Sequence, residues 1–251
     1  MRFIFGLAIT VLLGVAGCSE DSPVADAPPG SPGAATDGGS VKAPQAENTG
    51  AVEVRVTYAG APVVETVKIN KDVEQCGTEA RIEKIAVGDG QGLAHAVVAV
   101  EGLEGPPTAR TPQIDQRGCQ FRPHVVAMQT GDIDILNSDG ILHNIHTYSE
   151  VNPAINKAQP KFKKTMTETF TKPEIVKVTC DVHSWMVGWI AVLPHPYFGV
   201  TGGDGATRID GVPAGTHTVE AWHEVLGRRT QDVAVKPGET TRIVFEFPKS
   251  G

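Results

Sequence analysis

Short runs that alternate apolar or β-branched residues with polar ones dominate the chain between residues 52 and 193. The clearest are VEVRVTY (52–58), AHAVVAVEG (94–102), PHVVAM (123–128), DIDILNS (132–138), EIVKVTC (174–180) and GWIAVL (188–193). A two-residue period places side chains on alternate faces of a β-strand. Turn residues such as Gly131-Asp132 and Asp139-Gly140 separate the runs, and no segment shows a sustained helical period. We therefore predict an all-β fold, either a sandwich or a Greek-key barrel.

The N-terminus has the layout of an export signal. Residues 1–17 carry one Arg, then an apolar core, then small residues, which is typical of a secretory signal peptide. Val15-Ala16-Gly17-Cys18 resembles the lipobox of bacterial lipoproteins, in which the Cys becomes the lipid-modified first residue of the mature protein. The alternative is an ordinary signal peptide that happens to contain a Cys. We expect a lipid on Cys18 that anchors the protein to a membrane of the cell envelope, facing the periplasm or the exterior.

The segment that follows has the composition of a tether. Residues 18–49 are almost devoid of large apolar side chains and rich in Pro, Gly, Ala, Ser and Asp. Such a segment cannot bury enough surface to fold, so we predict a flexible tether. About 200 residues remain, enough for one large or two small β domains. The formal net charge of −7 argues against nucleic acid and anionic lipid surfaces as partners.

The cysteines leave one thiol unpaired. With Cys18 assigned to a lipid, Cys76, Cys119 and Cys180 remain in a compartment that favours disulfides. Cys76 and Cys119 have no neighbouring ligand pattern, so we assign them to each other as a disulfide. Cys180 is then a free thiol, and binding to a metal in a dry site would protect it from oxidation.

Metal-ligand chemistry surrounds that free thiol. Cys180, His183 and Met186 offer a thiolate, an imidazole and a thioether in one loop between two predicted strands. The fourth ligand must come from elsewhere, and the best candidate is His143, at the start of a predicted strand. Two His, one Cys and one Met form the ligand set of a copper site with a weak axial thioether. The alternatives are a zinc site, or hydrogen-bonded core histidines beside a buried thiol.

Residues 119–193 resemble the small blue-copper proteins, or cupredoxins, of the plastocyanin and amicyanin type. The Cys-x2-His-x2-Met spacing is that of amicyanin, and His143-Asn144 matches the upstream His-Asn of the family. The resemblance implies a Greek-key β-sandwich or barrel, which we expect over residues 91–194, with one type 1 copper ion. It also implies that Asn144 braces the copper loop by hydrogen bonds.

The C-terminal part indicates a second, smaller β-sandwich unit. Residues 204–224 resemble the carboxypeptidase regulatory-like (transthyretin-like) modules, through an Asp-x-Gly turn, a strand and a Gly-Val-Pro-x-Gly segment. We place this unit at residues 195–248, where only the later half of such a module is visible. Residues 50–90 contain strands of uncertain membership. One interpretation is that they supply the early strands of the second unit, which would make the copper domain an insertion.

The other histidines are expected to lie outside the site. His146 follows His143 by three residues, so on a regular strand the two side chains point to opposite faces. His95, His124, His195, His217 and His223 have no paired spacing, which favours a surface or hydrogen-bonded structural role for each. Among them His223, between Trp222 and Glu224, is the strongest candidate for another role.

A single copper ion favours a carrier over an enzyme. The chain has no His-x-His pair, so a trinuclear oxygen site is excluded, and a site with four protein ligands leaves no open position for a substrate. We predict a carrier of single electrons between redox partners, such as a cytochrome or a dehydrogenase. The alternatives are a copper storage or delivery protein, and a surface β-sandwich interaction module in which copper is dispensable.

Overall fold

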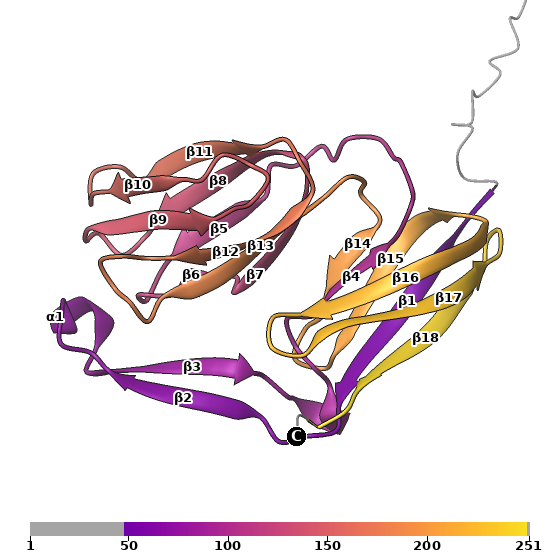
Figure 1. The fold of residues 1–251 in the computed structure, drawn as a ribbon, viewed down its shortest axis with the longest axis horizontal. Helices are drawn as coiled ribbons and strands as arrows, with labels where there is room; N and C mark the ends of the chain where they lie inside the picture. The colour runs from indigo at the N-terminus through magenta and orange to yellow at the C-terminus, as the bar shows by residue number, and fades with distance from the viewer. Residues whose placement is uncertain (1–47, 250–251) are drawn as a thin grey trace, which may run out of the picture. The chain divides into compact units, whose positions relative to one another are not determined.

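The computed structural model describes residues 48–249 (Figure 1), so the predicted signal peptide, Cys18 and nearly all of the tether lie outside the described residues. Strands dominate this part, and its helical segments are the four-residue α1 (Val73–Cys76) and the 3-10 turn η2 (Asp89–Gln91). The prediction of an all-β fold is confirmed. Within residues 48–249, no helix has the length and apolar character needed to cross a membrane.

The first of two sandwiches contains the predicted ligands and consists of two sheets. One sheet has the order β10 (Asn156–Gln159), β9 (His143–Tyr148), β12 (Glu174–Thr179), β13 (Val187–Leu193) and β7 (Val125–Gln129). The other has the order β11 (Thr165–Phe170), β8 (Gly131–Asn137), β5 (Gln113–Gln116) and β6 (Phe121–Arg122). Alternate residues of these strands are fully buried, among them Ile133 and Ile135 of one sheet and Val176 and Val178 of the other. The two-residue period therefore supplies the apolar core between the sheets.

The second sandwich combines strands from both ends of the described chain. Its sheets have the orders β15 (Ala206–Pro213), β1 (Thr49–Tyr58), β18 (Thr240–Phe247) and β14 (Phe198–Val200), β4 (Val97–Val100), β16 (Gly215–His223), β17 (Gly227–Val235). β1 runs parallel to β18 and antiparallel to β15. The first sandwich is thus inserted in the chain between β4 and β14, which is the arrangement that the sequence left open.

The position of β4 corrects one predicted boundary. We expected the copper domain to begin at residue 91, but β4 forms hydrogen bonds with β14 and β16 of the second sandwich. All four residues of β4 are apolar and buried. A run of this kind indicates a strand that is covered on both faces. It does not indicate which strands form hydrogen bonds with it.

A hairpin of β2 (Val63–Lys68) and β3 (Glu79–Ile85) carries α1 in the loop that joins its strands. Ile69 and Ala80 at the α1 end are buried in the core of the first sandwich, whereas Ile85 at the other end lies in the core of the second. Cys76 of α1 forms a disulfide with Cys119, with their Cα atoms 5.4 Å apart. The α1 end of the hairpin is therefore bonded to the sandwich that contains the predicted ligands.

Candidate metal centre

Neighbouring strands bring the predicted ligands to one end of their sheet. β9 and β12 are antiparallel partners, with Thr179 paired to His146. Cys180 directly follows the last residue of β12, and His143 is the first residue of β9. Because the two strands are antiparallel, both residues lie at the same end of the sheet. Two backbone hydrogen bonds close the loop that follows: the N–H of Met186 donates to the carbonyl of His183 (2.9 Å), and the N–H of Cys180 donates to the carbonyl of Met186 (3.3 Å).

Three candidate ligand atoms form a compact triangle. The Sγ of Cys180 lies 3.8 Å from the Nδ1 of His143 and 3.8 Å from the Nδ1 of His183, and the two Nδ1 atoms are 3.0 Å apart. A point in their plane that is equidistant from all three lies about 2.1 Å from each atom, close to the usual metal–imidazole and metal–thiolate bond lengths. The three side chains thus form a group that could hold a metal ion.

The site is dry, and its thiol is free. Cys180 is the unpaired cysteine among the described residues, and it is 1% exposed, while His143 and His183 are fully buried. Burial raises the pKa of the Cys180 thiol, although the backbone N–H of Asn144, 3.5 Å from Sγ, partly opposes that shift. A metal ion would therefore have to displace the thiol proton when it binds.

Met186 lies in the same loop and is 1% exposed. The loop's two backbone hydrogen bonds link its main chain directly to Cys180 and His183. Beside it, the indole N–H of Trp185 donates to the carbonyl of Cys119 (3.1 Å), and the Trp185 and His183 rings lie 5.1 Å apart. The main chain of Met186 is thus bonded to two of the candidate ligand residues and its thioether is buried, while the Trp185 ring packs beside the imidazole of His183.

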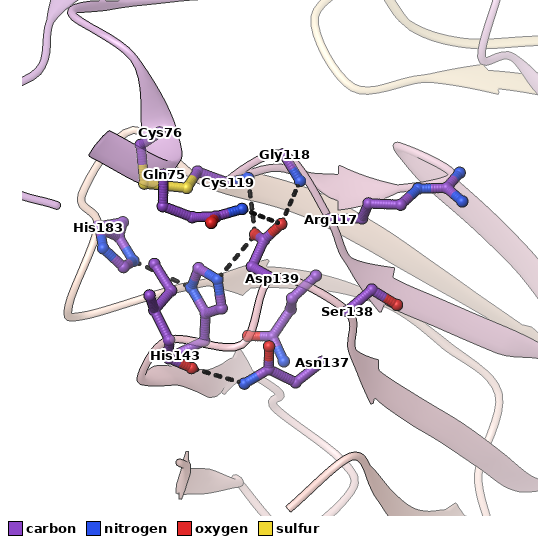
Figure 2. A network of polar contacts seen from close by, with 12 residues as sticks. Gln75, Cys76, Arg117, Gly118, Cys119, Asn137, Ser138, Asp139, His143 and His183 are labelled. Atoms are coloured by element: carbon purple, nitrogen blue, oxygen red, sulfur yellow. Dashed lines mark hydrogen bonds and ion pairs between the residues drawn. A yellow bond between two sulfur atoms is a disulfide. The ribbon is translucent and has the colours of Figure 1, made fainter. Parts of the chain in front are cut away.

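Asp139 holds His143 from the side away from the triangle (Figure 2). Its Oδ2 lies 3.0 Å from the Nε2 of His143 and accepts a hydrogen bond from the backbone N–H of Cys119 (2.8 Å), while its Oδ1 accepts one from the backbone N–H of Gly118 (2.6 Å). Gly118 and Cys119 have positive φ angles of 63° and 52° in the turn between β5 and β6, which directs both N–H groups to one carboxylate. Burial lowers the pKa of His143, and Asp139 partly offsets that shift. A carboxylate behind the imidazole orients Nδ1 toward the triangle.

Asp72 holds His183 in the same manner, but it comes from the hairpin. The Oδ2 of Asp72 lies 2.9 Å from the Nε2 of His183, although 111 residues separate the two in the chain. Asp72 precedes α1 in a left-handed conformation (φ 50°) and makes no capping hydrogen bond, so its carboxylate is available to the imidazole. Asp is among the few residues that tolerate this backbone conformation well.

Asn144 connects β9 to the cysteine loop. Its side-chain oxygen accepts a hydrogen bond from the backbone N–H of Asp181 (2.5 Å), and its Nδ2 donates to the Asp181 carboxylate (3.1 Å) and to Asn156 (2.9 Å). Together with the contact from its own N–H to Cys180 Sγ, these bonds fix the start of the loop.

A buried amide network lies beneath His143. Asn137 donates from Nδ2 to the carbonyls of Ile141 (2.8 Å) and Gln159 (3.0 Å), and Gln116 donates to the side-chain oxygen of Gln159 (2.5 Å). All three amide side chains are at most 1% exposed. The Oδ1 of Asn137 and the Oε1 of Gln116 have no hydrogen-bond partner among the described residues, so it is the donated bonds of Asn137 that hold the loop between Asn137 and His143.

The remaining histidines lie outside the triangle. His146 contacts Asp181 (2.9 Å) and stacks on Tyr148. His124 forms a hydrogen-bonded pair with Glu224, whose other oxygen accepts from the indole N–H of Trp189 (2.6 Å). His223 is buried, and burial lowers its pKa to about 4. None of these belongs to a group of three potential ligands in the described residues.

Two positioning residues were missed by the reasoning from sequence. Asp139 could have been found, because it lies four residues before His143 in a turn that leads into the same strand. Asp72 has no signal of that kind, since it lies in a loop without a ligand pattern, far from His183 in the chain.

A second group, Cys119 with Asp139 and His143, also satisfies the metal-site geometry. The disulfide removes Cys119 from it as a thiolate.

No protein-family model matches the chain, and no curated protein matches it significantly. Several solved structures match part of the chain. A copper-containing nitrite reductase from Thermus scotoductus SA-01 matches with 21% identity and a TM-score of 0.30, over 38% of this chain and 25% of its own. A Cu(I) form of an amicyanin mutant matches with 16% identity and a TM-score of 0.31, over 38% and 98%. A purple cupredoxin from Nitrosopumilus maritimus matches with 20% identity and a TM-score of 0.28, over 33% and 99%.

This chain spans a quarter of the nitrite reductase and nearly all of the two small cupredoxins.

Proposed function

We propose that this protein is a type 1 copper protein that carries single electrons, with His143, Cys180, His183 and Met186 as ligands. The observation that carries the proposal is the triangle of one thiol sulfur and two Nδ1 atoms, with edges of 3.8, 3.8 and 3.0 Å, closed by a loop that ends at a buried Met. Sulfur ligands favour Cu(I), and imidazole suits both oxidation states. Bound copper would supply a centre that gains and loses one electron.

The surroundings of the ligands favour a carrier over a storage or delivery protein. Both imidazoles are fully buried, and each is held at its outer nitrogen by a carboxylate. A carrier benefits from ligands that move little between oxidation states, and carboxylates that fix the imidazole rings supply this rigidity. A delivery site would need ligands that open readily to an acceptor.

The wider role rests on the sequence. We propose that a lipid on Cys18 anchors the protein in the cell envelope, and that its partners are redox proteins. We also propose that the protein is not an enzyme, because four protein ligands leave no position for a substrate on the metal.

Addition of Cu(II) to the purified protein tests the proposal. We expect an intense visible thiolate-to-copper absorption band that disappears on reduction and returns on oxidation, and we expect Cys180→Ser to abolish it. His146→Gln is the matched control, because His146 lies near the site but outside the triangle, and it should keep the band. If wild-type protein shows no such band, the proposal is wrong. If the band appears but mild chelators remove the metal, copper delivery becomes the better assignment.

A further inference from the structure

An exposed turn of unusual composition joins β10 to β11. The N–H of Lys163 donates to the carbonyl of Pro160 (2.8 Å), which closes the turn. At its tip the Phe162 side chain is 81% exposed, the highest value among the large apolar residues in the described part of the chain. An aromatic ring held in water at the tip of a closed turn has no role in the core of this molecule.

Three lysines flank Phe162 in the chain. Lys161, Lys163 and Lys164 are all exposed, and none of them forms an ion pair with any carboxylate in residues 48–249. The formal net charge of the chain is −7. An uncompensated cluster of positive charge on an acidic protein is a local feature that distinguishes this turn from the rest of the surface.

The turn lies close to the candidate metal centre. Gln159, the last residue of β10, pairs directly with His143 in the sheet. Phe162 comes three positions after Gln159, so the Cα atoms of Phe162 and His143 lie within about 16 Å of each other. The backbone N–H of Asn137 donates to the carbonyl of Lys164 (2.9 Å), which holds the turn against the loop that leads to His143. Leu142, which precedes His143, is 46% exposed.

The surface beside the other imidazole has a different character. The outer nitrogen of His183 faces Asp72, and the disulfide from Cys76 to Cys119 fastens the α1 segment that follows Asp72. The His143 side of the centre therefore has an exposed apolar and basic surface, whereas the His183 side has a carboxylate from the hairpin.

We propose that Leu142, Lys161, Phe162, Lys163 and Lys164 form the docking surface for the redox partner, and that the partner presents an acidic protein surface around an apolar centre. The inference rests on the proposed function, because it names the surface through which the same centre exchanges electrons. An apolar contact with a charged rim matches the usual anatomy of a protein interface. The lysines would steer an acidic partner and raise its rate of association.

Two forms of one haem protein provide the probe: cytochrome c with its native basic surface, and cytochrome c made acidic by succinylation of its lysines. In stopped-flow mixing of the reduced copper protein with each oxidised cytochrome, we expect faster electron transfer to the succinylated form at low salt. The difference should shrink as salt screens the charges. Lys161→Glu with Lys163→Glu should slow the reaction with succinylated cytochrome about 10-fold. Phe162→Ala should slow it at high salt as well, because the contact it removes is apolar.

Lys236→Glu with Lys249→Glu is the matched control, since it makes the same change in net charge at exposed positions of the second sandwich. If the two double variants slow the reaction equally, the docking proposal is overturned. NMR shifts of the copper protein on addition of succinylated cytochrome separate docking from electron transfer. Unchanged signals at residues 160–164 overturn the docking surface whether or not electrons move. Shifted signals without electron transfer support the surface and count against the proposed function.

Discussion

The two imidazoles of the candidate site are held by carboxylates of very different origin. Asp139 lies four residues before His143, and its side chain is 3% exposed. Asp72 lies 111 residues before His183, and its side chain is 38% exposed. Asp139 also accepts two backbone hydrogen bonds from a neighbouring turn, whereas the hairpin carries Asp72 to the site from outside the sandwich. Asp139 therefore belongs to the sandwich that contains the ligands, whereas Asp72 belongs to the hairpin that packs against it.

The largest effect should follow from Asp139→Ala. It leaves the buried Nε2 of His143 and the N–H groups of Gly118 and Cys119 without their acceptor, so we expect the free energy of unfolding to fall by about 3 kcal/mol. Metal affinity should fall by about 10- to 100-fold. Denaturant unfolding and competition titration with a chelator measure the two quantities. Asp139→Asn, which keeps one acceptor oxygen, should be intermediate, and a loss in Asp139→Ala below about 1 kcal/mol would contradict the role given to this carboxylate.

Removal of the disulfide should come next. Cys76→Ser with Cys119→Ser opens a loop with a sequence separation of 43 residues, and we expect a loss of about 2 kcal/mol in the free energy of unfolding. Because α1 is then no longer bonded to the sandwich, contact between Asp72 and His183 should also weaken. Reduction of the wild-type disulfide should reproduce the loss. Unchanged denaturant midpoints in both experiments would show that the hairpin is held by its apolar contacts alone.

Asp72→Ala should separate orientation of the ligand from stability. Since the carboxylate is partly exposed, its loss should change the free energy of unfolding by less than about 1 kcal/mol. Metal affinity should still fall about 10-fold, because the His183 ring loses the group that orients it. The nitrogen NMR shifts of His183 in the metal-free protein report the tautomer directly and should change. Glu74→Ala, an exposed acidic residue of α1, is the control, and equal behaviour of the two variants would refute the positioning role of Asp72.

A third carboxylate, Glu174, should give the smallest effect because it braces a loop and no ligand. Burial alone would raise its pKa, but hydrogen bonds from Ser149, Asn152 and two backbone N–H groups lower it to about 2. Glu174 therefore stabilises the fold above its unfolded pKa of about 4.5, and this contribution is lost as the pH falls toward 2. In Glu174→Gln the denaturant midpoint should vary less over this range, with metal affinity at neutral pH unchanged. A parallel pH dependence in both proteins would rule out this role.

The site residues that could be predicted from the sequence are those whose partners lie nearby in the chain. Cys180, His183 and Met186 share one loop, and the β-pattern on both sides indicated that loop, so their spacing alone suggested a common centre. Asp139 is a local partner of the same kind. Asp72 and β4 are different, because each depends on a pairing across more than a hundred residues. Asp72 lies in a loop, and β4 is a run of four apolar residues. Neither local sequence indicates which distant residue or strand it contacts.

The bond between Cys76 and Cys119 makes one part of the site depend on redox conditions. Such a bond forms in oxidising surroundings and is kept open in a reducing cytoplasm. In reducing surroundings a folded chain would have its cysteine loop and Asp139 but would lack the covalent link that fastens the Asp72 segment beside His183. A thiol oxidation outside the ligand set would therefore change how firmly one imidazole of the candidate metal centre is held.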